Sequence, residues 1–254
     1  MQKLILSTLG EIEQKHHIQI IYAVESGSRA WGFASADSDY DVRYIYIRPT
    51  EDYLRVNEIR DTIEGPLDDV LDFSGWDVRK ALELLRRSNP SLLEWARSPI
   101  VYKTTPEWDM MAAAIPEYFS VSSNMHHYQA MYLRTWNTQL QGEQVRLKKY
   151  FYVLRPLLCS RYLAQYGVMP PIAFDELRAA MLPESLAPVV DELIRLKQTS
   201  DEKALISHIP VLDDFLQSEF ARLDAVLHSM DKKPLLPYDR LNELFRKLIA
   251  QAWS

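Results

Sequence analysis

The stretch that decides the fold is residues 20–47, IIYAVESGSRAWGFASADSDYDVRYIYI. On either side of its centre, residues 17–24 and 41–47 carry Ile, Val and Tyr in short alternating runs, which predict two β-strands. Glycine, serine and aspartate fill the segment between these runs. A third apolar run, ending in Val70-Leu71-Asp72-Phe73, predicts another strand farther along the chain.

From about residue 75 onward the apolar residues recur with helical spacing. Gly75-Trp76-Asp77 is expected to open a helix, and an edge strand is expected over residues 100–103. The fold class expected is therefore α+β. We expect a sheet-containing domain over residues 1–115, followed by a mainly α-helical domain over residues 116–254.

Composition excludes several classes of protein. Of the 254 residues, 47% are hydrophobic and 25% charged, which excludes a disordered chain, a collagen-like fibre and a bare coiled coil. The net charge of −6 argues against an indiscriminate nucleic-acid coat. A single cysteine allows no intrachain disulfide and fits a reducing cytosol, so a cytoplasmic location is expected. The first 17 residues are typical of an amphipathic helix and not of a signal peptide, and no apolar run predicts a membrane span.

Two of the seven glycines, Gly27 and Gly32, lie within six residues of each other, directly after the first predicted strand. Gly27 can adopt backbone angles that other residues avoid, and it lets a ligand approach the main chain closely. A helical turn that follows would direct free N–H groups at an anion, and the Ser28 hydroxyl could add a hydrogen bond. The pattern indicates a phosphate-binding turn; a plain strand-to-helix turn is the alternative.

Asp39 and Asp41 precede and enter the second predicted strand. Alternate residues of a strand point to the same face, so these two carboxylates are expected side by side. Carboxylates that close repel each other, and a divalent cation such as Mg²⁺, which prefers oxygen ligands, relieves the conflict. A solvated acidic loop is the alternative.

Asp72 is a third candidate acid, because it is embedded in an apolar strand where an unpaired charge is costly. If its strand pairs beside residues 41–47, Asp72 can join Asp39 and Asp41. Three carboxylates around two metal ions suit phosphoryl or nucleotidyl transfer. Three nearby acids compete with Asp72 for this role. Asp68 and Asp69 are expected to be exposed loop acids, and Asp77 is expected in the first turn of a helix.

These residues resemble a known family. A Gly-Ser turn, an Asp-x-Asp pair and a later strand Asp are together similar to the DNA polymerase β-like nucleotidyltransferase superfamily. The chain most resembles the bacterial and phage nucleotidyltransferases associated with RNA repair, over roughly residues 20–165. Four stretches carry this likeness: ESGSRAWG (25–32), DSDYDVR (37–43), NPSLLEW (89–95) and KKYFYVLRP (148–156).

The resemblance implies a mixed sheet with flanking helices, followed by helices that close over a nucleotide. It implies that the turn Gly27-Ser28-Arg29 holds the triphosphate. It also implies that Asp39 and Asp41 bind two Mg²⁺ or Mn²⁺ ions, and that Asp72 binds the catalytic one and helps to deprotonate the attacking hydroxyl. The bulky Trp31 and Phe33 beside the turn are a departure from the family's pattern, and we expect them to pack the turn rather than stack on a base.

The helical region contains a basic segment. Between Arg134 and Arg161 there are six basic residues and one acidic residue, within a chain whose net charge is −6. Lys148 and Arg155 are seven residues apart and so share a helix face. We expect Lys148, Lys149 and Arg155 to bind the nucleotide's phosphates, because Lys supplies a point charge and Arg a bidentate fork. A solvated helix face, including Lys149 and Arg161, is the alternative.

The function expected is a metal-dependent nucleotidyltransferase. It would transfer a nucleoside monophosphate from a nucleoside triphosphate to a hydroxyl acceptor, foremost an RNA end, and release pyrophosphate. Two alternatives are a non-catalytic module that senses a nucleotide or RNA, and an antitoxin-like enzyme that adenylylates a partner protein. The sequence does not select the base.

Overall fold

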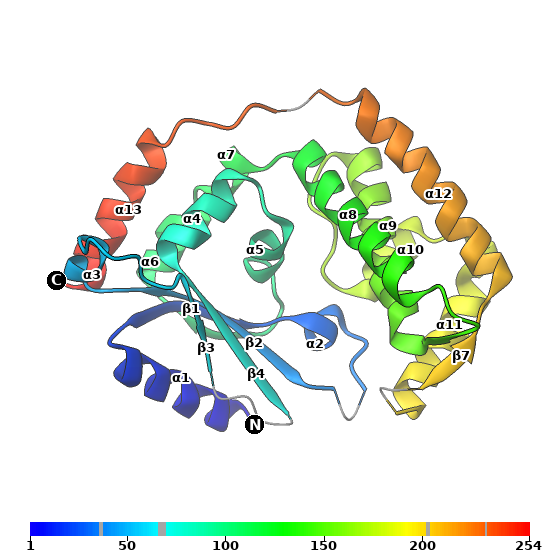
Figure 1. Cartoon of the computed structure of the whole chain (residues 1–254), viewed down its shortest axis with the longest axis horizontal. Coiled ribbons are helices and arrows are strands. Elements are labelled where there is room, and N and C mark those ends of the chain that lie inside the picture. The colour runs from blue at the N-terminus through cyan, green and yellow to red at the C-terminus, as the bar shows by residue number, and fades with distance from the viewer. Residues whose placement is uncertain (36–37, 66–69, 202–203, 232) are drawn as a thin grey trace. The chain divides into compact units, whose positions relative to one another are not determined.

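A computed structural model describes residues 1–35, 38–65, 70–201, 204–231 and 233–254. Asp37, Asp68 and Asp69 lie outside these described residues. The chain forms two compact units (Figure 1). The sheet unit comprises residues 1–30, 39–119 and 234–254, and the helical unit comprises residues 31–38 and 120–233.

The elements of the sheet unit, in chain order, are α1 (Gln2–His16), β1 (Gln19–Glu25), α2 (Gly27–Trp31), β2 (Tyr40–Ile47), α3 (Thr50–Tyr53), β3 (Thr62–Glu64), β4 (Leu71–Asp77), α4 (Val78–Arg86), α5 (Pro90–Trp95), β5 (Val101–Thr104), α6 (Pro106–Ala112), α7 (Ile115–Tyr118) and α13 (Asp239–Ala252). The last residue of α2 belongs to the helical unit. The helical unit contains α8 (Val121–Gln139), β6 (Gln144–Arg146), α9 (Leu147–Tyr166), α10 (Phe174–Met181), a 3₁₀ turn (Glu184–Leu186), α11 (Ala187–Thr199), β7 (Leu205–Ser207) and α12 (Pro210–Ser229).

The sheet of the first unit is mixed and has the strand order β3-β4-β2-β1-β5. Strand β1 runs antiparallel to β2 and β5, β3 runs antiparallel to β4, and β2 and β4 run parallel. The expected edge strand is confirmed as β5. The expected fold class, α+β with a mixed sheet, is also confirmed.

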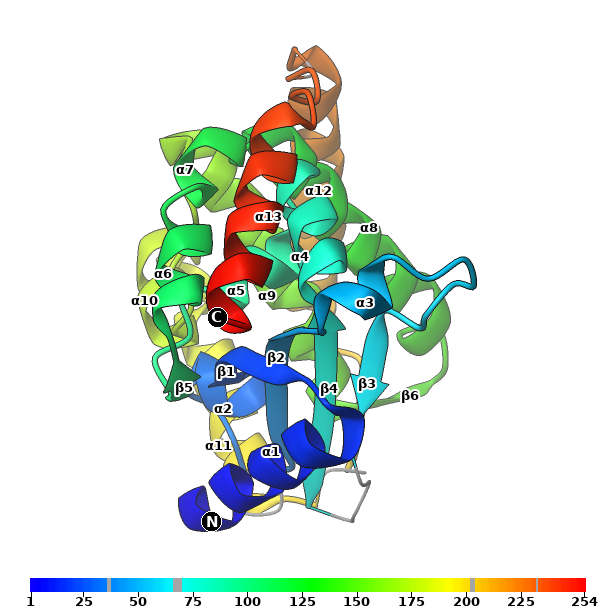
Figure 2. The same cartoon turned by 90° about the vertical axis from the view of Figure 1, so that its left-hand side faces the viewer.

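Both faces of this sheet are buried. One face packs against α1 through Ile5, Leu9 and Ile12, which lie four and three residues apart and so form one helix stripe. The other face packs against helices that include α4, α5, α6 and α13. Figure 2 shows α1 on one side of the strands and α4 and α13 on the other.

The helix expected to open at Gly75 begins later, and that expectation was wrong. Strand β4 continues to Asp77, and α4 starts at Val78. Gly75 pairs with Tyr44 of β2, and a Cβ added to Gly75 would lie only 2.0 Å from the Tyr44 ring. The glycine is therefore required by an aromatic ring that covers it from the neighbouring strand, and it does not mark a helix start.

The helical unit is built around α9. This helix continues through Pro156. Proline removes one backbone donor, but the surrounding residues of α9 are almost completely buried, so packing holds the helix on both sides. The short strands β6 and β7 pair as an antiparallel ladder that the sequence did not predict.

The two units are not divided as two consecutive segments. The expected boundary near residue 115 lies close to Phe119, but two segments belong to the opposite unit from the one expected. Residues 31–38 belong to the helical unit, because Phe33 is buried against Phe151 and Phe174. Residues 234–254 belong to the sheet unit, because α13 contributes Leu241, Leu248 and Ile249 to its core.

Candidate active site

The parallel pairing of β2 and β4 places two of the predicted acids together. Asp41 and Asp72 are register partners on these adjacent strands, as expected if the strands pair. Arg43 lies between them: its Nη2 is 2.8 Å from Asp41 Oδ1 and 2.7 Å from Asp72 Oδ2. Because both oxygens contact one nitrogen, they are at most about 5.5 Å apart. The guanidinium offsets the repulsion between the carboxylates.

The Gly27 turn lies directly against Asp41. Gly27 has φ +60° and begins the short helix α2, as a phosphate-binding turn requires. A Cβ at this position would lie 2.0 Å from Asp41 Oδ2, so only glycine fits. Ser28 follows on the same turn and is half-buried. The predicted turn and one predicted carboxylate therefore form one site.

Asp39 lies one residue before β2, and it is exposed. Arg29 holds its main chain, since Arg29 Nε donates to the Asp39 carbonyl at 3.0 Å. The Arg29 guanidinium also lies 3.7 Å from the centre of the Tyr40 ring. Within the part of the chain that the structure describes, no three Asp, Glu, His or Cys side chains gather closely enough to hold a metal ion. Asp39 thus does not form a preassembled cluster with Asp41 and Asp72.

Glu25 is a site residue that sequence reasoning missed. It is the last residue of β1 and is completely buried. Its Oε1 accepts a hydrogen bond from the Asp41 N–H at 2.8 Å, and its Oε2 accepts one from the Tyr102 hydroxyl. Burial raises the pKa of the Glu25 carboxyl, and these hydrogen bonds oppose the shift. The available signal was an acid that ends an apolar strand directly before the Gly-Ser turn.

The predicted basic residues all lie on α9 in the helical unit. Lys148 and Lys149 are half-buried in its first turn, and burial together with the charges of Lys148 and Arg146 lowers the pKa of Lys149. Arg155 is only 2% exposed, and its guanidinium lies 4.3 Å from the centre of the Trp31 ring. Arg155 therefore packs inside the helical unit in this structure.

The remaining competitor, Asp77, lies at the opposite end of the parallel strand pair from Asp72. It was expected in the first turn of α4, and that was wrong: it ends β4 and caps α4, accepting a hydrogen bond from the Arg79 N–H at 2.8 Å. Asp77 also contacts Arg48 at 3.4 Å and accepts a hydrogen bond from Tyr53. Burial raises the pKa of Asp77.

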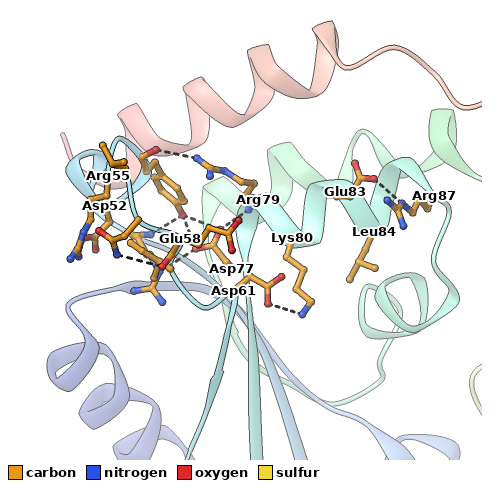
Figure 3. A pocket seen from close by; sticks show the side chains of 15 residues that line it. Asp52, Arg55, Glu58, Asp61, Asp77, Arg79, Lys80, Glu83, Leu84 and Arg87 are labelled. Atoms are coloured by element: carbon orange, nitrogen blue, oxygen red, sulfur yellow. Dashed lines mark hydrogen bonds and ion pairs between the residues drawn. The ribbon is translucent and has the colours of Figure 1, made fainter.

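Asp77 borders a cavity of about 420 Å³ (Figure 3). Acids and bases alternate around it and largely pair with one another, as Lys80 does with Asp61 and Arg87 with Glu83. Because the opposite charges of the lining side chains largely cancel, the cavity does not carry the positive charge that would attract a nucleotide.

The carboxylate pair has suitable chemistry for a divalent cation. Asp41 and Asp72 supply hard oxygen ligands close together, and they already share one positively charged group. Two ligands of one Mg²⁺ lie about 3–4 Å apart, given metal–oxygen distances of about 2.1 Å. The residues fit such an ion once the Arg43 guanidinium moves aside, with Asp39 free to approach from its exposed position.

The chain is similar to known proteins over most of its length. The chain is 39% identical over 258 residues to a Bacillus subtilis (strain 168) protein described as "Uncharacterized protein YcgL", covering 100% of this chain and 98% of that protein. A solved structure of a nucleotidyltransferase-like protein from Exiguobacterium sibiricum 255-15 is 14% identical and matches 89% of this chain and 75% of that one, with a TM-score of 0.31. A family model matches residues 1–247. The chain thus belongs to the RNA repair pathway DNA polymerase beta family, RlaP.

Proposed function

We propose that this protein is a metal-dependent nucleotidyltransferase that transfers a nucleoside monophosphate from a nucleoside triphosphate to a hydroxyl, with an RNA end as the acceptor. Family and fold indicate a nucleotidyltransferase. The observation that carries the proposal is the register pairing of Asp41 with Asp72 beside the Gly27 turn. Carboxylates for cations and a turn for phosphate thereby meet at one place.

Each part of the site has a role in this reaction. The turn Gly27-Ser28 would bind the triphosphate through backbone N–H groups and the Ser28 hydroxyl. Asp39, Asp41 and Asp72 would hold Mg²⁺ or Mn²⁺, which when bound neutralises phosphate charge and makes the attacking hydroxyl more acidic. Asp72 would accept the proton of the acceptor hydroxyl. The new bond forms between that oxygen and the α-phosphorus, and the bond to the departing pyrophosphate breaks.

Arg43 has a role of its own before the ions bind. A site with two neighbouring carboxylates is unstable without a cation, because the charges repel. The guanidinium supplies that cation within the chain and holds the two carboxylates facing each other. Because of its position, the guanidinium also competes with a metal ion for the two carboxylates, and it must move away before the ion can bind.

The RNA acceptor rests on the family, whose description places it in an RNA repair pathway. The basic residues at the start of α9, Arg146, Lys148 and Lys149, support the same idea because affinity for a nucleic-acid backbone comes mainly from cationic side chains. These residues would bind phosphates of the nucleotide or of the RNA end.

The test is transfer of label from each α-labelled nucleoside triphosphate, with Mg²⁺ or Mn²⁺, to an RNA with a free 3′ hydroxyl. A matched RNA with a blocked 3′ end is the negative control, and a cell extract supplies alternative acceptors. We expect labelling of the free RNA end, and loss of at least about 100-fold of that rate in Asp41→Asn and Asp72→Asn. Asp61→Asn is the matched control, since Asp61 pairs with Lys80 at the other end of β4.

Three results would contradict the proposal in different ways. Transfer that survives in Asp41→Asn would remove the carboxylate role. Label on a protein from the extract, and none on RNA, would favour the adenylylating enzyme. Saturable nucleotide binding with no pyrophosphate released by the wild type would favour the sensing module.

A further inference from the structure

Glu25 is a buried acid whose position needs an explanation. It ends a strand whose other described residues are nearly all apolar, and its side chain is inaccessible to solvent. Burying a carboxylate is costly unless hydrogen bonds replace the lost water. Both of its oxygens are hydrogen-bonded, one to Asp41 and one to Tyr102.

The main chain on either side of Glu25 is also fixed. The Glu25 N–H donates to the Ile100 carbonyl at 2.9 Å, and the Ser98 hydroxyl donates to the Glu25 carbonyl at 2.6 Å. The residue is therefore anchored to the segment that leads into β5. From this anchor its side chain reaches across to β2.

The contact with β2 is made at Asp41. The Asp41 N–H donates to the Glu25 carboxylate at 2.8 Å, and the Asp41 carbonyl accepts a hydrogen bond from the Ser26 N–H at 2.9 Å. Both polar groups of the Asp41 main chain are thus held by the two residues that precede Gly27. A carboxylate acceptor makes the first of these bonds stronger than a bond between neutral groups.

Little positional error can be tolerated here. The space between Gly27 and Asp41 does not admit a methyl group, since a Cβ at Gly27 would lie 2.0 Å from Asp41 Oδ2. A displacement of about 1 Å at reacting groups can reduce a rate about 100-fold. The hydrogen bond from Asp41 to Glu25 sets the separation of the acid and the turn.

We propose that Glu25 is a positioning residue that holds the Asp41 main chain, and so sets where the Asp41 carboxylate meets a metal ion and the Gly27 turn. Tyr102 supports it by donating to its second oxygen. The inference rests on the proposed function. It assigns Glu25 no contact with substrate and no proton transfer.

Two substitutions separate the effect of the length of the Glu25 side chain, its reach, from the effect of its charge. Glu25→Asp keeps the charge but shortens the side chain by about 1.5 Å, which is enough to break a hydrogen bond of normal length. Glu25→Gln keeps the reach and an acceptor oxygen for the Asp41 N–H but removes the charge. Tyr102→Phe is the matched control, because it leaves the bond between Glu25 and Asp41 in place.

Five quantities are measured for each variant: the melting temperature, hydrogen exchange of the Asp41 amide, the Mn²⁺ dissociation constant by calorimetry without nucleotide, and kcat and KM for transfer. We expect Glu25→Asp to lose at least about tenfold in Mn²⁺ affinity and in kcat, with faster exchange at Asp41 and KM changed less than about threefold. Tyr102→Phe should stay within about threefold of the wild type in Mn²⁺ affinity, Asp41 exchange, kcat and KM. Glu25→Gln should do so in Mn²⁺ affinity, kcat and KM, whereas its neutral acceptor holds the Asp41 N–H less strongly, so that amide should exchange faster.

Losses of Mn²⁺ affinity and kcat in Glu25→Gln without such losses in Glu25→Asp would show that charge and not reach matters, and would overturn the inference. So would a folded Glu25→Asp protein with wild-type Mn²⁺ affinity and Asp41 exchange. If Glu25→Asp does not fold, faster Asp41 exchange in Glu25→Gln than in Tyr102→Phe supports the inference, and equal exchange overturns it. A wild type without transfer defeats the proposed function alone, since the exchange rates at Asp41 still test Glu25.

Discussion

Replacing Arg43 with methionine should make the protein less stable without metal and increase its stabilisation by metal. Arg43 Nη2 bonds one oxygen of Asp41 and one of Asp72, and its Nη1 donates to the Asp72 carbonyl at 3.0 Å. Methionine keeps most of the apolar stem and removes the charge. The two carboxylates then face each other with no guanidinium between them.

The size of the effect follows from their separation. Two unit charges about 5.5 Å apart repel by about 0.8 kcal/mol in water and by about 3 kcal/mol at an effective dielectric constant of about 20. The side chains of Asp41 and Asp72 are 27% and 40% exposed, so solvent screens them and the lower half of this range applies. We expect a loss of about 1–2 kcal/mol, which lowers the melting temperature by about 2–8 °C in a chain of this size.

A bound divalent cation should reverse this loss. In the wild type the ion must displace the guanidinium from the two carboxylates, whereas in Arg43→Met there is no guanidinium to displace. The increase in melting temperature at saturating Mn²⁺ should therefore be larger in the variant than in the wild type. Thermal unfolding with and without Mn²⁺ measures both quantities.

The control for this prediction is Arg60→Met. Arg60 pairs with Glu64 at 3.3 Å, and both side chains are more than half exposed, so its loss should cost at most about 0.5 kcal/mol and leave the Mn²⁺ response unchanged. The reasoning is refuted if Arg43→Met is as stable as the wild type without metal. An equal or smaller gain from Mn²⁺ in Arg43→Met would refute it too.

Three further expectations concern other parts of the chain. Gly27→Ala should reduce Mn²⁺ affinity and the rate of transfer at least about tenfold, because the added Cβ would displace a carboxylate. In the control Gly10→Ala the added Cβ has no atom within 4 Å, so both quantities should stay unchanged and α1 should be stabilised by up to about 1 kcal/mol. His208 hydrogen-bonds a carboxylate at 2.8 Å, which raises its pKa above 6.5. The stabilisation that this pair supplies is complete below about pH 6.5 and is lost as the pH rises through the folded-state pKa of His208. The difference in melting temperature between wild type and His208→Gln should therefore narrow from about pH 6 to pH 8.5. A constant difference would contradict this. Arg155→Gln should lower the melting temperature of the helical unit, because a desolvated cation over an aromatic ring contributes about 2 kcal/mol, and a variant that melts like the wild type with a raised KM would instead assign Arg155 to phosphate binding.

Much of the site was predictable because its determinants are local. Alternation of apolar residues located β1 and β2, and the glycine between them indicated a turn, which the structure shows at Gly27 with a positive φ. That this turn binds phosphate stays a prediction. The proximity of Asp72 to Asp41 required only that two predicted strands be neighbours. The register then followed, because paired strands place equivalent faces together.

The remainder depends on contacts between distant residues. Gly75 was expected at a helix start because its need for space arises from Tyr44, thirty-one positions earlier in the chain. Strands β3, β6 and β7 have three residues each, too few to show any period. The burial of Arg155 is likewise invisible in the sequence, since a basic residue on a helix is usually solvated.

Most of the helical unit, residues 120–233, is an insertion between α7 and α13, and this limits how the protein can be shortened. A fragment cut after residue 119 would contain all the candidate carboxylates and the glycine turn, yet it would lack α13 and expose the apolar surface that Leu241, Leu248 and Ile249 cover. Excising residues 120–233 and joining Phe119 to Pro234 would retain that helix, but residues 31–38 would lose the aromatic side chains against which Phe33 packs. We therefore expect that no smaller folded protein with the same candidate site can be obtained from this chain by truncation alone.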